Sequence, residues 1–549
     1  MNNLLKILIP SFLLLLPLVS SAQGVGIHHS SKEVYEFLDE LASLHIIQIN
    51  SVVKPYSRVF IARKLEEASS KSDKLSKRQQ QELSFYLKEF EKELAGNYET
   101  DNLVKRIRHI REPHHRRADL FFYRDSLFTM WINPIGGYHR FYNGDTAFFN
   151  RWSGAEASAH IGDRWSFYVS FRDHTITYNL KSKSQLTTMQ GLDNKGDPNA
   201  KQIYSSDMRG GMYYTWDWGS LGFVKDHIVW GNNYHSSLIF SGRTPSFSMI
   251  KLQINPVKWF DFNYVHAFLN SEVEDTSRAI NWPSGAKRRE WHPKFLAANI
   301  YSFHLWKHLT ASVGNSMIYS NSVNPAYLMP FILFKSVEHT ISMSNEGNAQ
   351  IFLDFSSRNI KHLHLYGSFF VDEFSFSNMR DSAKHSNWFG MKAGFRLSGL
   401  PRNLFFTAEW TRTNPMIYKH YFPTSTFASN RYGLGHYLGD NAREYYFSLV
   451  YKPLRGLILS MDYIYADKGT DYPDIRRPYI AKHFMDKIEW SKRSLAFRGS
   501  YEIFRDFQVY AEICKSNVTA IDQTTLDKYS APFYQGERFI TSFGVNFNY

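Results

Sequence analysis

The chain has 549 residues but only one cysteine, Cys514, so an intramolecular disulfide cannot form. After the first 22 residues it has no run of about 18 consecutive apolar residues, the length that a transmembrane helix needs. It also lacks the Gly-x-Ser-x-Gly motif of serine hydrolases. These absences argue against a disulfide-stapled scaffold and a bundle of transmembrane helices. We expect no catalytic residues, no metal site and no cofactor, and we predict that the protein is not an enzyme.

The first 22 residues have the pattern of a secretory signal peptide. A short basic start with Lys6 precedes a mostly apolar run from Ile7 to Val19. Small residues follow at positions 20–22, where a signal peptidase reads them. The apolar run is short for a membrane anchor. The sequence therefore predicts an exported protein that is cleaved after Ala22.

Residues 23–100 are predicted to form a small helical bundle on the periplasmic side. Apolar residues recur there at helical spacing. Ser57 can cap one helix, and Ser76 with Gln79 has the spacing of a capping box that opens another. The segment that follows is rich in Lys and Arg, and we assign residues 101–126 to a basic linker.

From about Leu127 the hydrophobic period changes from that of a helix to that of a β-strand. In "WSFYVSFR" (165–172), large apolar residues alternate with mostly polar ones. We find about 18 such runs, each with one face that suits an apolar medium and one that tolerates charge. Aromatic residues make up 17% of the chain, which suits a barrel with aromatic girdles at two membrane interfaces.

The connections between these runs alternate between tight and long. Tight turns include "GDR" (162–164), "KH" (307–308) and "GS" (219–220), which suits a hairpin turn with glycine first. Long loops such as 414–444 separate them. Transmembrane barrels have short periplasmic turns and long extracellular loops. The sequence therefore predicts a mainly β fold, a transmembrane antiparallel β-barrel of about 18 strands over residues 127–549, in the outer membrane.

The chain ends on an amphipathic strand, "FITSFGVNFNY" (539–549). Phe543, Val545, Phe547 and Tyr549 fall on its apolar face. A free apolar edge strand invites aggregation. We expect this last strand to pair with the first and close the barrel, with Tyr549 at the inner membrane interface. A terminal aromatic strand also resembles the signal that outer-membrane assembly machinery reads.

The net charge of +13 favours anionic partners. Acidic glycans and the phosphates of outer-membrane lipids and lipopolysaccharide fit an exported chain, whereas nucleic acid does not. Solvated loops and turns are an equally good explanation of the charge. Charged residues on the predicted lumen faces, such as Arg172 and Glu409, could line a pore or pair with one another and fill it.

Four segments resemble the Wzi-type capsule assembly proteins. They are "VYEFLDELASLHIIQINSVVKPYSRVFIARKLEEA" (34–68), "DHIVWGNNYHSSLIFS" (226–241), "NPAYLMPFILFKSVEH" (324–339) and "GHYLGDNAREYYFSLVYKP" (435–453). The first is similar to that family's N-terminal helical segment and the others to scattered parts of its barrel. The resemblance implies an outer-membrane β-barrel that acts as a lectin and holds capsular polysaccharide at the cell surface.

Three long loops combine aromatic and cationic residues, a composition that suits stacking on sugar rings and pairing with uronates. Packing of these aromatics against one another, and contacts between the cations and lipopolysaccharide phosphates, would explain the same composition. The candidate ligand-binding residues are Trp282, Arg288, Arg289 and Trp291 in the first loop, His420 and Tyr421 in the second, and Tyr472, Arg476, Arg477 and Tyr479 in the third.

Two other functions remain open at this point. A porin or transporter for small solutes would need an open lumen, and conductance in a bilayer would reveal it. A barrel hydrolase is a weaker alternative because no recognised nucleophile motif accompanies the plentiful serines and histidines.

Overall fold

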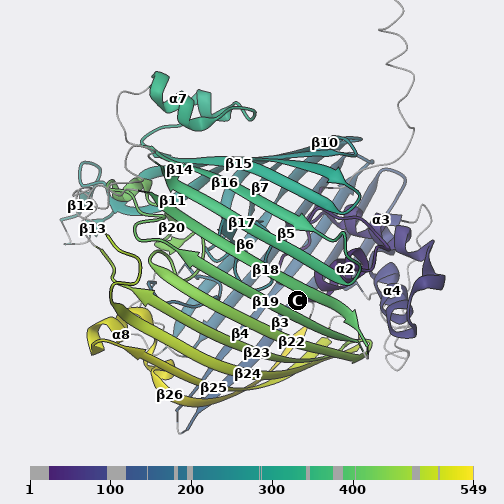
Figure 1. Ribbon diagram of the computed structural model, residues 1–549. Helices are drawn as coiled ribbons and strands as arrows, with labels where there is room; N and C mark the ends of the chain where they lie inside the picture. The colour runs from purple at the N-terminus through teal and green to yellow at the C-terminus, as the bar shows by residue number, and fades with distance from the viewer. Residues whose placement is uncertain are drawn as a thin grey trace, which may run out of the picture.

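Eighteen antiparallel strands form a closed barrel with short helices at one end, as the computed structural model shows (Figure 1). The structure describes residues 24–94, 119–144, 146–177, 183–193, 202–283, 285, 287–341, 347–374, 387–401, 403–472, 482–504 and 507–547. The predicted signal peptide and most of the predicted linker lie outside these residues. Of the helices in the described part, none combines the length and apolar character that crossing a membrane requires.

Each barrel strand pairs with the next barrel strand along the chain, so the predicted strand number is confirmed. The barrel strands are β3 (Phe128–Asn143), β4 (Thr146–Ile161), β5 (Trp165–Ile176), β6 (Ile203–Trp216), β7 (Gly219–Asp226), β10 (Phe247–Val257), β11 (Phe260–Glu274), β14 (Trp291–Trp306), β15 (Leu309–Ser320), β16 (Asn348–Ser357), β17 (Leu363–Glu373), β18 (Trp388–Leu400), β19 (Leu404–Thr413), β22 (Ala442–Leu454), β23 (Leu457–Gly469), β24 (Ile488–Phe504), β25 (Phe507–Ala520) and β26 (Gly536–Phe547).

The smaller elements lie before the barrel and in its loops. They are α2 (Lys32–Ser43), β1 (Val53–Lys54), α3 (Arg58–Ser69), η1 (Ser72–Lys74), α4 (Lys77–Glu89), α5 (Glu91–Leu94), β2 (Phe121–Arg124), β8 (Val229–Trp230), β9 (Phe240–Ser241), β12 (Ile280–Asn281), β13 (Lys287–Arg288), η2 (Pro325–Leu328), α7 (Phe334–Ile341), η3 (Pro423–Ser425), β20 (Ala428–Ser429), β21 (Tyr432–Gly433), α8 (Gln523–Tyr529) and η4 (Pro532–Tyr534).

The last strand closes the barrel against the first, as predicted. Residues 540–547 of β26 pair with residues 136–143 of β3. β2 pairs with residues 129–132, near the start of the same strand β3, although the sequence placed β2 in the linker. Tyr549 lies outside the described residues.

Side chains of β26 alternate between the outside of the barrel and its lumen. Phe543 and Phe547 are 50% and 39% exposed, whereas Ser542 and Asn546 are buried. Other strands continue this exposed apolar surface around the barrel, at Phe447, Leu459, Met461, Phe497 and Ile513. A closed barrel leaves no strand edge to be satisfied by water, so an apolar exterior is stable in lipid. The molecule is an outer-membrane β-barrel.

The tight turns predicted at 162–164 and 307–308 lie between consecutive strands as expected, but the one between β6 and β7 does not. There the turn is Asp217–Trp218, and Gly219 already pairs with Trp216, so the predicted turn at Gly219–Ser220 is wrong by two residues. A Cβ at Gly219 would lie 2.6 Å from the Trp216 ring. The glycine is therefore needed for a close approach rather than for a turn.

The predicted helical bundle is present at residues 32–94. Ser57 accepts a hydrogen bond from the backbone of Phe60, and Ser76 and Gln79 form a complete capping box. The buried core of the bundle includes Phe37, Leu38, Leu41, Ile61, Leu65 and Leu83. In Figure 1 the bundle lies at one end of the barrel, opposite α8, β12 and β13. The short turns lie at the same end of the barrel as the bundle. For example, His362, in the turn before β17, donates its backbone N–H to the backbone oxygen of Ser43 in α2 (2.7 Å).

The connection between β15 and β16 folds over the outside of the barrel (Figure 1). We call residues 324–341, which include η2 and α7, the outer-wall flap. Its Tyr327 and Phe334 are buried against Phe262 and Met317 of the wall. The packing of this flap on the barrel wall was not predicted from the sequence.

Candidate functional site

The lumen is filled from both ends. β1, from the N-terminal segment, pairs with β8, and β8 pairs with β9 of the long loop between β7 and β10. Val53 lies opposite Trp230, and Trp230 opposite Phe240. This three-stranded sheet is separate from the barrel wall. The N-terminal segment and the loop therefore meet inside the barrel.

Apolar packing holds this plug against the wall. Trp230 is fully buried, with its ring 5.2 Å from that of Phe240 and 6.1 Å from that of the wall residue Phe352. The loop between β19 and β22 also turns inward, where Phe427 stacks on Phe240 at 5.4 Å. Tyr418 of that loop donates its hydroxyl to Leu238 O (2.6 Å). We call residues 227–246, 416–418 and 427–438 the lumen plug.

Buried polar groups also join the plug to the wall. Glu409 accepts hydrogen bonds from the Tyr234 backbone (2.6 Å) and from Lys392 Nζ (2.6 Å). Asp354 accepts a hydrogen bond from the backbone of Asn232 (3.0 Å). The charge of Glu409 is therefore paired inside a filled lumen and does not line a pore.

The bundle is docked at its end of the barrel by ion pairs. Glu36 of α2 lies 3.1 Å from Lys452 Nζ and 3.5 Å from the Arg396 guanidinium. Asp39 lies 2.8 Å from Arg358. Burial alone would raise the pKa of Glu36, but the two cations lower it to about 2. The acidic face of α2 thus matches basic residues of the wall.

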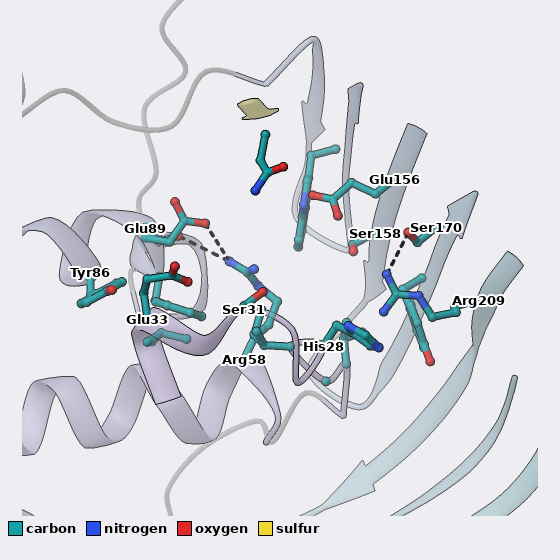
Figure 2. Close-up of a pocket in the computed structure, with 18 of the residues that line it drawn as sticks. His28, Ser31, Glu33, Arg58, Tyr86, Glu89, Glu156, Ser158, Ser170 and Arg209 are labelled. Atoms are coloured by element: carbon teal, nitrogen blue, oxygen red, sulfur yellow. Dashed lines mark hydrogen bonds and ion pairs between the residues drawn. The ribbon is translucent and has the colours of Figure 1, made fainter. Parts of the chain in front are cut away.

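A pocket of about 200 Å³ remains between the bundle and the wall. Figure 2 shows Arg58 pointing toward Glu89, 3.9 Å away, and Arg209 pointing toward Ser170, to which it donates a hydrogen bond of 3.3 Å. His28 also lines the pocket. Cations and carboxylates are mixed here, so the pocket does not favour a ligand of one particular charge.

Beside this pocket, His28, Asp226 and His227 bring their ligand atoms within 4.8 Å of one another. His28 Nε2 and His227 Nδ1 are 3.0 Å apart, which is a hydrogen-bond distance. Burial lowers the pKa of His28 well below its usual range. Neutral imidazoles could ligate a metal ion, but the Arg209 guanidinium lies 3.9 Å from Asp226 and opposes a cation there.

The loop surface at the other end of the barrel carries the described candidate residues. Trp282 and Arg289 are exposed on the hairpin of β12 and β13, to which Arg288 belongs. Trp291 begins β14 and is 37% exposed. Arg476, Arg477 and Tyr479 lie outside the described residues.

Lys419, next to the candidates His420 and Tyr421, links their loop to the loop of Tyr472. His420, Tyr421 and Phe422 form a row of rings, with centroids 4.6 and 4.1 Å apart. Lys419 Nζ donates a hydrogen bond to Tyr472 O (3.3 Å). The structure thus joins two of the three predicted loops.

A cluster of ion pairs that the sequence analysis missed ties these loops together. Asp440 pairs with Lys419 and Lys468, and Asp471 pairs with Lys419 and Lys528 of α8. Burial alone would raise the pKa of Asp471, but the lysines hold it well below its usual range. Loop residues follow no hydrophobic period, so no signal in the sequence could have paired them.

Comparison with solved structures finds a match to the fold over nearly the whole chain. The chain aligns over 97% of its length, and over all of the other chain, with Wzi of Escherichia coli, at a TM-score of 0.56 and 12% identity. The chain has the fold of Wzi. That protein is described as an outer-membrane carbohydrate-binding β-barrel involved in group 1 capsule assembly.

Weaker similarities cover less of the chain. OccAB2 of Acinetobacter baumannii aligns over 76% of this chain and 97% of its own, at a TM-score of 0.43 and 8% identity. OccK5 of Pseudomonas aeruginosa aligns over the same shares, at 0.42 and 11% identity. By sequence, no family model and no curated protein matches the chain.

Proposed function

We propose that this Wzi-like barrel binds an acidic surface polysaccharide, such as a capsule, and anchors it at the cell surface. The observation that carries the proposal is the filled lumen, in which the plug packs Trp230, Phe240 and Phe427 against the wall. A barrel filled in this way suits a scaffold for surface loops better than a channel. The fold that it shares with a carbohydrate-binding barrel supports the same function.

The proposal includes an orientation. The loop surface faces the outside of the cell, and the bundle and short turns face the periplasm, because outer-membrane barrels place their long loops outside. Residues 1–22 are removed on export, residues 23–100 form the periplasmic bundle, residues 101–126 link it to the barrel, and residues 127–549 form the barrel. Its other partners are outer-membrane lipids, lipopolysaccharide and the outer-membrane assembly machinery.

The loop surface supplies the chemistry for a sugar polymer. Tyr421 and Phe422 are 40% and 36% exposed and offer ring faces for stacking. Arg289 is exposed on the hairpin of β12 and β13 and can pair with uronate carboxylates. Lys419 is already paired with Asp440 and Asp471, so its role is to position the aromatic row. Binding should weaken with salt without vanishing, since salt screens the cations but not the stacking.

The experiment compares a deletion strain with strains carrying loop variants. Tyr421→Ala with Phe422→Ala, and Trp282→Ala with Arg289→Ala, should each lower cell-bound polymer and weaken binding of the purified barrel by roughly tenfold, about 1.4 kcal/mol. Trp306→Ala with Lys307→Ala is the matched control, because it removes an exposed aromatic and a cation at the short-turn end. That control should retain wild-type binding.

Two results would contradict the proposal. One is a deletion strain that keeps all of its surface polysaccharide. The other is equal loss of binding in the loop variants and the control. The alternative function is a porin or transporter for small solutes. It would replace the proposal if the purified barrel conducted ions freely in a planar bilayer while binding no polymer.

A further inference from the structure

The outer wall of the barrel carries polar side chains that are buried although they point outward. Asn299 is fully buried, and it alternates along β14 with the lumen-facing residues Ala298 and Ile300. Asn315 of β15 lies directly opposite Asn299 and is 6% exposed. On its other side Asn315 lies opposite Ile351, which is 41% exposed. The asparagine pair therefore sits at a level where the barrel faces hydrocarbon.

The outer-wall flap satisfies these polar groups. Asn299 Nδ2 donates hydrogen bonds to Pro330 O (2.8 Å) and Ile332 O (2.9 Å), and Asn315 Oδ1 accepts one from the Phe334 backbone (2.9 Å). Asn315 Nδ2 in turn donates to Asn299 Oδ1 (2.6 Å). In hydrocarbon an unsatisfied backbone group costs several kcal/mol. The asparagines therefore allow an irregular backbone segment to lie against the wall at membrane depth.

More contacts fix the flap in place. Tyr264 donates its hydroxyl to Tyr327 O (2.8 Å), and the Phe331 ring stacks on Phe262 at 4.4 Å. Phe262 is only two residues from the start of β11 at the short-turn end. The flap thus reaches from the loop end of the barrel far down its outer wall.

The other side of the flap is apolar and exposed. Leu328, Met329, Phe331 and Leu333 are 41%, 51%, 57% and 49% exposed. No charged residue occurs from Asn321 to Phe334. A segment that has exposed apolar side chains, carries no charge and has its backbone bonded to an outward-facing wall suits lipid rather than water.

We propose that residues 324–334 of the outer-wall flap are inserted in the hydrocarbon of the membrane and bind lipid acyl chains through Leu328, Met329, Phe331 and Leu333. The Asn299–Asn315 pair is its anchor on the wall. This connection between strands is therefore a lipid-binding surface of the barrel and not part of the aqueous loop surface.

Spin labelling tests the insertion, and the single native cysteine makes it practical. In a Cys514→Ser background the label is placed by Phe331→Cys, and the barrel is reconstituted in phosphatidylcholine vesicles. Phe543→Cys on the outside of β26 serves as the lipid-facing reference, and Ile280→Cys on the β12 hairpin as the aqueous one. We expect the label at 331 to match the one at 543, with high access to oxygen and low access to a water-soluble nickel chelate.

Access to the nickel chelate equal to that of the 280 label would overturn the proposal. Low access to both reagents would also overturn it, because protein, such as a second copy of the chain, would then cover the flap. Asn299→Leu with Asn315→Leu tests the anchor and should raise nickel access at 331 several-fold. Ser302→Ala with Ser312→Ala is the matched control, because this hydrogen-bonded pair (2.8 Å) joins the same strands on the lumen side. Unchanged access in the asparagine variant would refute the anchor.

Discussion

Trp230→Ala should loosen the lumen plug without opening the barrel wall. Trp230 is fully buried and joins three parts of the molecule, because it pairs with β1 from the N-terminal segment, with β9 of its own loop and packs on Phe352 of the wall. The wall strands keep all of their ladder hydrogen bonds in this variant. The perturbation therefore acts on the plug alone.

The magnitude follows from the burial. Replacing a fully buried Trp by Ala costs about 3–5 kcal/mol. If that cost falls on the equilibrium between seated and released plug, the released fraction rises by a factor between about 10² and 10⁴. A plug that is seated almost all the time in the wild type would then be released often enough to be seen as channel events.

Single-channel recording in planar bilayers is the assay. We expect brief openings in Trp230→Ala, a quiet wild type, and a quiet Trp306→Ala, which removes a Trp that is 69% exposed at the rim. Proteolysis within residues 227–246 should increase in parallel. If Trp230→Ala is as quiet and as protected as the wild type, apolar packing at this residue does not hold the plug.

Three further predictions concern docking, assembly and orientation. Protonation of Glu36 removes its attraction to Lys452 and Arg396, so docking of the bundle should be at full strength above pH about 4.5 and weaken as the pH falls toward 2. Limited proteolysis of the bundle measures this docking, and the Glu36→Gln variant should be less sensitive to pH over that window. Equal protection of the wild-type bundle at pH 2 and pH 6 would contradict the role of this ion pair. Deleting residues 544–549 removes half of the pairing between β26 and β3, so the chain should stay in the periplasm and be degraded; a truncated barrel in the outer membrane would refute this reading of the closing strand. An epitope inserted at 276–285 should be accessible on intact cells, whereas one at Asp217–Trp218 should not be, and the reverse pattern would invert the proposed orientation.

The strands could be predicted because their signal is local. In β5 and β26 one face meets lipid and the other meets the lumen, so apolar and polar residues alternate with period 2. The helix caps at Ser57 and Ser76 are equally local, and both were found. The turn at Asp217–Trp218 was misplaced because Gly219 is needed for close packing instead: a Cβ there would lie 2.6 Å from the Trp216 ring and 2.7 Å from the backbone oxygen of Gln253 on the next strand.

The arrangement of the candidate loops was harder to predict, because nothing in the sequence indicates which loops contact one another. The aromatic and cationic residues could be identified by composition, but not the contact between Lys419, next to His420, and the backbone of Tyr472. Their contacts depend on Asp471 and Lys528, which come from separate loops. Which of these residues bind a ligand stays a prediction.

The amino-acid sequence by itself determined the strand number and the face that each strand turns to lipid, because each of these depends on neighbours a few residues apart. Only the tertiary structure decided whether the lumen is open. On β11 both faces are apolar, and the structure shows why: Val265 packs inside against the plug, and Phe262 packs outside under the flap. Both coverings come from distant loops, and such long-range contacts leave no period in the sequence.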